Sequence, residues 1–282
     1  MIYNKKNIFI MKKFLLLSLL IFITIQLFSQ TSKNPSKLNI VSWNIQNFGR
    51  SKSSSDSVMK YICEKVKDYD IIAIQEVSTS EFGSQAVAKL DELLDRTGTS
   101  WDYVVSDPTT GSGSERYAYL YKKDRVKLKE KPCLEKTLED KINREPFKAV
   151  FVFNSSNYYL FNLHLVPTDK NPALEAAHLA SLGETYKDKK IILMGDLNLS
   201  QSDVGFNSVK KWAKPTLIGK KTSLKMKEGE EGERLNMEYD NFFVTTNIVV
   251  SKSDVINFFS EFKDLKLARK ISDHCPIYCI IK

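Results

Sequence analysis

Short apolar segments that end abruptly in acids, amides or histidines recur along this chain, and they constrain its fold more than any other feature. The segment DIIAIQ at 70–75 ends at Glu76, and the segment IILMG at 191–195 ends at Asp196. Continuous apolar runs of this length are typical of strands that are covered on both faces. Because a rigid strand body fixes the side chain that follows it, we expect these polar ends to form a site at the edge of a sheet.

Amphipathic helices are interspersed with these strands. One is predicted within 53–68 with Ser55 or Asp56 as N-cap, one over 85–96, and one over 172–188 with Pro172 in its first turn. Strands outnumber helices, which favours a two-sheet α/β sandwich with the helices outside. The predicted strands cover 38–43, 70–77, 101–107, 116–122, 125–129, 147–153, 158–165, 190–198, 239–246, 254–260 and 274–281.

The first 29 residues have the pattern of a secretory signal peptide. They contain four lysines and no acid, and an apolar stretch at 14–28 is followed by small and polar residues. A membrane anchor is the alternative, but it usually needs about 20 apolar residues. Met11 offers an alternative start. We therefore predict a signal peptide over 1–29 and a single domain over 30–282, secreted or periplasmic, without stable membrane association after cleavage.

Charge by itself identifies no partner. The chain of 282 residues has a formal net charge of +8, and removal of the predicted signal would leave about +4 on about 253 residues. Seven lysines gather within 210–227, and an acidic cluster follows up to 234. We expect the segment 210–234 to be a solvated surface loop, with a basic arm that touches nucleic acid as the alternative.

The four cysteines form neither a disulfide framework nor a zinc motif. Cys275 and Cys279 would lie about 13 Å apart on one extended strand, too far to bridge. We expect Cys63 and Cys279 to act as small buried hydrophobes.

The polar strand ends suggest a chemistry when they are taken together. Asp196 and Asn198 can share one side of an extended segment. Oxygen ligands without thiolates suit a hard cation such as Mg²⁺, with Mn²⁺ or Ca²⁺ as alternatives. His164 and His274 could supply a general acid and a general base near neutral pH. Each motif alone is commonplace in turns and on surfaces, but five in one chain point to a catalytic site. The five are Asn44, Glu76, His164, Asp196 with Asn198, and Asp273 with His274.

Eight motifs, in this order, resemble the endonuclease/exonuclease/phosphatase superfamily, and more narrowly its deoxyribonuclease I branch. The resemblance extends from Leu38 to the end of the chain. The motifs are WNIQNFG (43–49), IQEV (74–77), SERYAYLY (114–121), REPF (144–147), NLHLVPTD (162–169), LMGDLN (193–198), YDNFFV (239–244) and ISDHCP (271–276).

The resemblance implies a deoxyribonuclease I-like fold, a four-layer α/β sandwich of two packed, mostly antiparallel sheets flanked by helices. It also implies metal-dependent cleavage of phosphodiesters, with His164 and His274 on either side of the scissile phosphate. One would deprotonate the attacking water and the other would protonate the leaving 3′ oxygen. The remaining implied roles are metal binding by Glu76, Asn44, Asp196 and Asp273, orientation of the histidines by Glu115 and Asp240, and contact with phosphate oxygens by Asn198 and Arg144.

The chain also departs from the deoxyribonuclease I pattern. Ser78 and Gly113 stand where that branch has an Arg and a Tyr that enter the minor groove, so binding in that manner is not implied. Ser200 replaces an acidic residue linked to structural calcium, and the cysteine beyond it is absent. His178, in a predicted helix, has no partner motif and is expected to be structural.

The sequence thus predicts a secreted, divalent-metal-dependent endonuclease that acts as a monomer on nucleic acid, with DNA as the expected substrate and 5′-phosphate ends as products. One alternative is a phosphoesterase of the same superfamily that acts on a phosphoinositide, a sphingolipid or another phosphate ester. A second alternative, of another class, is a binding protein or toxin subunit without catalytic activity. The preference for DNA or RNA, the number of metals and the role of 210–234 stay open.

Overall fold

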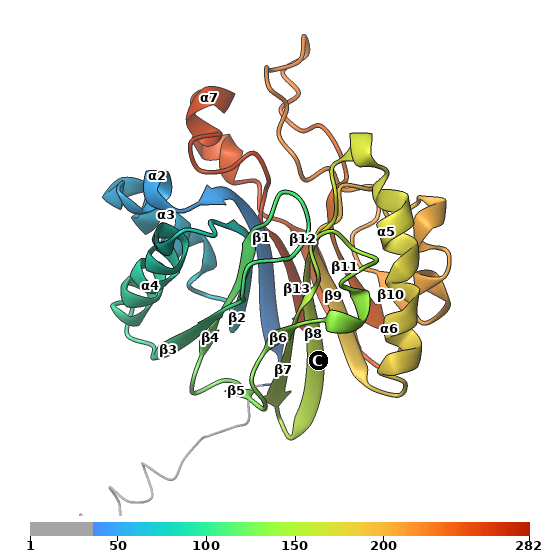
Figure 1. The fold of residues 1–282 in the computed structure, drawn as a ribbon. Coiled ribbons are helices and arrows are strands. Elements are labelled where there is room, and N and C mark those ends of the chain that lie inside the picture. Colours follow the sequence, from blue (N-terminus) through green and yellow to red (C-terminus); the bar gives the residue numbers. More distant parts are fainter. Residues whose placement is uncertain (1–35) are drawn as a thin grey trace, which may run out of the picture. The chain divides into compact units, whose positions relative to one another are not determined.

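The computed structural model describes residues 36–282, so the predicted signal peptide at 1–29 lies outside the described residues. Within this range two sheets form the centre of the fold (Figure 1). The six-stranded sheet has the order β12-β13-β1-β2-β4-β3, and the other has the order β10-β11-β9-β8-β7-β5, with β6 paired to β7. The pairs β1·β2 and β8·β9 are parallel and the rest antiparallel, which confirms the predicted mostly antiparallel sandwich.

The strand bounds follow the apolar segments closely. The strands of the six-stranded sheet are β1 (Leu38–Phe48), β2 (Ile71–Val77), β3 (Trp101–Val105), β4 (Arg116–Lys122), β12 (Val250–Val255) and β13 (Ile277–Ile281). Those of the second sheet are β5 (Lys127–Leu128), β6 (Cys133–Leu134), β7 (Phe147–Phe153), β8 (Ser156–His164), β9 (Lys190–Asp196), β10 (Ala213–Pro215) and β11 (Asp240–Thr245).

Three apolar clusters hold four layers together. Alternate residues of a strand point to opposite faces, and in β1 Ile40 packs between the sheets while Val41 and Trp43 pack outward against helices. Tyr119 of β4 stacks on Phe147 of β7 across the inner layer, with ring centroids 5.4 Å apart. Because both faces of the central strands are buried, their sequences are almost continuously apolar.

The helices cover the outer faces of the sheets. Helices α3 (Asp56–Val66) and α4 (Glu81–Asp95) pack on the six-stranded sheet, and α5 (Pro172–His178) and α6 (Ala180–Thr185) pack on the other (Figure 1). Two single-turn helices are α2 (Arg50–Ser53) and α7 (Leu265–Ala268). The 3₁₀ turns are Lys136–Leu138, Thr168–Lys170, Val204–Phe206, Val209–Lys211 and Phe258–Glu261.

Some predicted elements are wrong in part. The strand expected over 254–260 ends at Val255, because Phe258 turns inward to pack 5.5 Å from the Trp43 ring and starts a 3₁₀ turn. The helix expected over 172–188 breaks at Leu179 into α5 and α6. Helix α4 begins at Glu81, four residues before the predicted start, and Ser80 is its N-cap.

The segment 210–234 is not merely a solvated loop. It contains β10, and its middle residues Thr222, Ser223 and Leu224 are buried. Leu224 pairs with Leu235 to form the base of a hairpin, which projects from the end of the molecule that carries α7 (Figure 1). The prediction is wrong for this short buried stretch. It rested on composition, and the many lysines around the stretch made the whole segment look solvated.

Two further observations concern possible membrane spans and the cysteines. No helix among residues 36–282 is both long and apolar enough to span a membrane. Within the same range Cys63, Cys133, Cys275 and Cys279 are all free, and Cys63 and Cys279 are buried, as predicted.

Candidate active site

The polar strand ends converge on one cleft of about 700 Å³. Parallel strands present their carboxyl ends at the same edge, which is why β1 and β2 end together and β8 ends beside β9. In the second sheet His164 is in register with Asp196, and Asp196 is in register with Asp240. Three chemically competent side chains thus lie side by side across three adjacent strands. The cleft-lining residues that the sequence had predicted are Glu76, Glu115, Arg144, His164, Asp196, Asn198 and His274.

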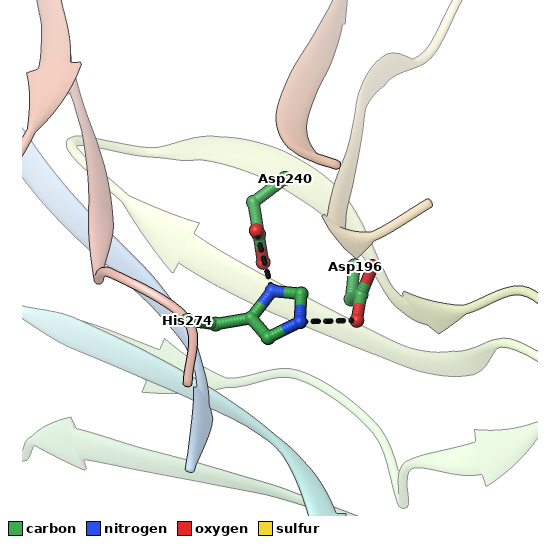
Figure 2. Close-up of side chains that lie close together, drawn as sticks. All are labelled: Asp196, Asp240 and His274. Carbon is green, nitrogen blue, oxygen red and sulfur yellow. Dashed lines mark hydrogen bonds and ion pairs between the residues drawn. The ribbon is translucent and has the colours of Figure 1, made fainter. Parts of the chain in front are cut away.

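His274 lies between two carboxylates (Figure 2). Its Nδ1 is 2.8 Å from Asp240 Oδ2, and its Nε2 is 3.4 Å from Asp196 Oδ2. The Thr222 hydroxyl donates to Asp240 Oδ2 at 2.6 Å and accepts from two backbone amides, those of Tyr239 and Asp240. Asp240 is therefore held in place beside the imidazole, where it can fix the orientation of that ring.

His164 has a matching arrangement on the other side of Asp196. Its Nδ1 is 2.8 Å from Glu115 Oε2, and its Nε2 is 3.5 Å from Asp196 Oδ2. Glu115 also accepts weakly from Arg144 Nη1 at 3.5 Å. Asp196 is thus shared by two imidazoles, each of which is held at its far nitrogen by a different carboxylate.

Buried charges set the protonation of both histidines. Burial alone lowers the pKa of His164, but the Glu115 carboxylate outweighs it and the net pKa lies above the ordinary value. Burial also opposes the charge on His274, and Asp196 and Asp240 together raise its pKa well above the ordinary value. Burial disfavours the Asp196 anion, yet the two imidazoles hold the pKa of Asp196 below its usual range. A proton is therefore available on either side of the central carboxylate.

Glu76 is aimed by a local distortion of β2. Its φ is +58°, a left-handed conformation that is uncommon for a residue other than glycine, and the pairing of β2 with β4 shifts register between Ile74 and Val77. The Asn44 side chain donates to Glu76 Oε1 at 2.8 Å and to Asp196 Oδ2 at 3.0 Å. Strain of this kind is commonly found at functional sites.

The predicted metal ligands do not all face one point. Glu76 and Asp196 are both within reach of one Asn44 amide, and their oxygens are of the type that Mg²⁺ prefers. Asn44 Oδ1 accepts a hydrogen bond from the backbone N–H of Gln46. The Asn44 side chain would therefore have to turn before this oxygen could bind a metal ion directly. Asp273 is not among the residues that line the cleft; it accepts from Gln46 Nε2 at 2.7 Å, and its buried Oδ1 has no hydrogen-bond partner within residues 36–282. The fit to a divalent cation is thus best at Glu76 and Asp196.

A second set of ligand-type atoms belongs to Asp196, Asp240 and His274, which lie within 4.8 Å of one another (Figure 2). Because the imidazole already lies between the two carboxylates, this set is better suited to moving a proton than to holding an ion.

Arg144 and Asn198 line the cleft but are partly committed to the backbone. Arg144 donates to the carbonyls of His164 and Leu165, and Asn198 Nδ2 donates to the Leu165 carbonyl at 3.0 Å. Both side chains therefore fix the end of β8, and both residues also line the cleft. His178 is exposed on α5 and takes no part in this site.

Three residues near the site were not singled out from the sequence. Thr222 holds Asp240, Gln46 holds Asp273, and Ser272 accepts from the His274 amide while it donates to the Asn44 carbonyl. Thr222 lay in the lysine-rich segment. The motifs around Gln46 and Ser272 had been noted, but nothing local indicated which atoms they would meet.

An α/β sandwich with two carboxylate-held histidines in such a cleft has the architecture of a phosphoesterase. The model of the Endonuclease/Exonuclease/phosphatase family matches residues 41–274, and the chain belongs to this family of hydrolases. Deoxyribonuclease-1 of Homo sapiens is 30% identical over 267 residues, which cover 87% of this chain and 92% of that protein. Deoxyribonuclease gamma of Homo sapiens is 26% identical, and the match covers 85% of this chain and 84% of that protein.

Solved structures confirm the fold. A family protein from Bacteroides thetaiotaomicron superposes with a TM-score of 0.62 at 16% identity, covering 88% of this chain and 98% of that chain. D. rerio TDP2, complexed with a single-strand DNA product, superposes with a TM-score of 0.61 at 19% identity. The match covers 88% of this chain and 99% of that chain.

Proposed function

We propose that the chain is an exported, divalent-metal-dependent endonuclease that hydrolyses DNA as a monomer and leaves 5′-phosphate ends. The observation that carries the proposal is the pair of histidines that face Asp196 from opposite sides, each held by its own carboxylate. Support for a nucleic-acid substrate comes from the relatives named deoxyribonuclease-1 and deoxyribonuclease gamma. Export is inferred from the basic and apolar pattern of residues 1–29.

The reaction follows from the placement of the proton-transfer groups. A phosphodiester bound between His164 and His274 meets one imidazole that takes a proton from the attacking water and another that gives a proton to the leaving 3′ oxygen. Glu115 and Asp240 stabilise the imidazolium form of their partners and keep each ring oriented. A divalent cation at Glu76 and Asp196 would stabilise the negative charge that grows on the phosphoryl oxygens. Donors of Arg144 and Asn198 add to that stabilisation.

Supercoiled plasmid tests the proposal directly. Purified protein with Mg²⁺ is expected to nick the plasmid, and EDTA is expected to abolish nicking. Sequencing of the product ends should find 5′-phosphates. Release of phosphate from inositol lipids, with DNA and RNA left intact over a range of metals, would instead identify a phosphoesterase of another specificity.

The two histidines provide the sharpest variants. His164→Ala and His274→Ala are each expected to lower the nicking rate by about 10²- to 10⁴-fold, because each removes a proton-transfer group. Circular dichroism and thermal melting should show that both variants fold. His178→Ala, which removes an exposed imidazole from α5, is the matched control and should keep the wild-type rate. Near-normal turnover in either cleft variant would exclude that residue from the acid–base pair.

Export is tested separately. N-terminal sequencing of the protein recovered outside the cytoplasm should find a start near Gln30. A mature chain that retains residues 14–28 would show that the segment is not a cleaved signal.

A further inference from the structure

One wall of the cleft carries a guanidinium group that the proposed reaction does not use. Arg50 is the first residue of α2, directly after the end of β1, and it lines the cleft together with Ser51, Ser78 and Ser80. Its side chain is exposed, and α2 lies at the end of the molecule where β1 finishes (Figure 1). The wall therefore belongs to the six-stranded sheet, whereas His164 and Asp196 come from the other sheet.

Arg50 differs from the other cleft cations in being uncommitted. Arg144 already donates to two backbone carbonyls and to Glu115. Both imidazoles are held by carboxylates. The Arg50 guanidinium, by contrast, forms no hydrogen bond or ion pair with any residue in the described range 36–282. All of its donors are thus available to a ligand that enters the cleft.

The position of this guanidinium is nevertheless defined. Its Cζ lies 4.1 Å from the centroid of the Phe82 ring, a cation–π contact with a half-buried side chain of α4. Stacking of this kind holds the planar group and leaves its edge free, which suits bidentate binding of phosphate oxygens. The contact with the Phe82 ring thus distinguishes Arg50 from an exposed arginine that is surrounded by solvent alone.

The neighbouring residues determine what kind of contact can form. Short side chains line the cleft beside Arg50, namely Ser51, Ser78 and Ser80, and Gly113 lines the cleft as well. Side chains of this size cannot reach deep into a groove of DNA, and the Arg50 guanidinium suits phosphate oxygens, so we expect contacts on this wall to go to the sugar–phosphate backbone. Backbone contacts fix the register of a nucleic acid without reading its sequence.

We propose that Arg50 binds a backbone phosphate adjacent to the one that is cleaved, and so makes the site selective for a polynucleotide over a substrate with a single phosphate. The inference rests on the proposed nuclease function and specifies its substrate class. The cleft centre contains the carboxylates Glu76, Glu115 and Asp196, which repel a polyanion. An uncommitted cation at the rim offsets that repulsion for a chain of phosphates. The resulting specificity is for several linked phosphates and is indifferent to base sequence.

Binding and cleavage of a fluorescent 20-base-pair duplex test this inference. In EDTA, where no cleavage is expected, fluorescence anisotropy should show about tenfold weaker binding for Arg50→Ala. The slope of log affinity against log salt should become shallower by about 1. With Mg²⁺, kcat/KM should fall about tenfold, with most of the change in KM.

Three further variants separate the roles of charge and position. Arg50→Lys should keep the wild-type salt slope but bind more weakly, since it retains the charge without the planar fork. Phe82→Leu should lose about threefold in affinity, because the guanidinium loses its ring platform. Arg96→Ala removes another exposed arginine, which lies at the C-cap of α4 outside the cleft, and should match the wild type.

Equal affinity and equal salt slope for Arg50→Ala and wild type would overturn the inference, as would an equal loss in Arg96→Ala. A fall in kcat with binding intact would also overturn it, because Arg50 would then act on the reaction rather than on an adjacent phosphate. Failure of the proposed function is recognised differently, by a wild-type protein that binds the duplex and does not cleave it with any divalent metal.

Discussion

At the scale of single residues, Asp196 is the point at which the site is organised. Both imidazole Nε2 atoms face its Oδ2, at 3.5 Å from His164 and 3.4 Å from His274. The same oxygen accepts from Asn44, which also contacts Glu76. One carboxylate therefore links the proton-transfer groups to the candidate metal ligand. The charge state of each histidine depends on this shared neighbour and on its own outer carboxylate.

Glu115→Gln tests the outer carboxylate of His164. The Glu115 charge opposes the effect of burial and raises the pKa of His164, so the neutral amide should lower that pKa. The limb of the pH–rate profile that His164 governs is then expected to move to lower pH. Profiles of kcat/KM from pH 5 to pH 9 measure this, and a profile with both limbs unmoved would contradict the role of Glu115.

At the scale of elements, register decides which side chains meet. The pairing of β8 with β9 sets His164 opposite Asp196, and the pairing of β9 with β11 sets Asp196 opposite Asp240. The segment 210–234 joins the same site, because the Cys275 amide donates to the Thr222 carbonyl and the Leu224 amide donates to the Asp273 carbonyl. A stretch that the sequence suggested to be solvated therefore positions His274 and its carboxylate.

Thr222→Val tests that contribution. The variant keeps the shape of the side chain but removes the hydroxyl that donates to Asp240 and accepts from two amides. Unpaired buried groups should cost about 1–3 kcal/mol of the free energy of unfolding and lower the nicking rate. Thr222→Ser is expected to recover most of both losses. Chemical denaturation and nicking assays measure them, and a fully active Thr222→Val protein would remove Thr222 from the site.

Helix α4 contains a carboxyl group that destabilises the protein at neutral pH. Burial, with a contribution from Asp95 and Asp102, raises the pKa of Asp91 to about 6. A raised folded-state pKa favours the protonated form, so this contribution to stability is full below pH 3.8 and is lost as the pH rises through about 6. The Asp91 Oδ1 atom is buried and has no hydrogen-bond partner in the part of the chain that the structure describes.

Asp91→Asn should therefore be more stable than wild type at pH 7.5 but not at pH 3.5. Because water still reaches the carboxyl group and screens it, we expect a gain of only about 1 kcal/mol, or about 2–4 °C in Tm. Thermal melts at the two pH values measure the difference. Glu92→Gln, an exposed neighbour on the same helix, is the control; an equal gain there would point to net charge rather than to the Asp91 site.

At the scale of the whole molecule, exposed lysines of the segment 210–234 and the charged groups of the cleft are separate places where a polyanion could bind. Lys220 and Lys221 are exposed outside the cleft, and Lys220 pairs with Asp254 at 3.3 Å. The cleft itself combines three carboxylates with two arginines and two imidazoles. Affinity for a polyanion should therefore depend on a few placed groups rather than on net charge.

The double variant Lys220→Glu/Lys221→Glu tests this view. Each lysine that contacts a phosphate contributes about 0.9 to the salt slope of DNA binding. We expect a change well below that value, because at 0.1 M salt charges act over only about 10 Å. Anisotropy titrations at several salt concentrations measure the slope. A decrease approaching 1.8 would make the segment 210–234 a DNA-binding arm.

The sequence by itself determined the layers of the fold and the chemical groups of the site. Apolar runs of strand length specify which segments are buried on both faces, and polar residues at their ends stand out because they break those runs. Local patterns of this kind also identified Glu76, Asp196 and both histidines. Such patterns can be recognised in the sequence because each one involves only residues that are a few positions apart.

Only the tertiary structure decided which groups face one another. The sharing of Asp196 by two histidines, the left-handed backbone of Glu76 and the burial of Thr222 result from strand register and from loop packing. So does the position of Arg50, which is an ordinary surface arginine in the sequence and an uncommitted cation in the cleft. These contacts join residues far apart in the chain, and no local pattern encodes the distance between them.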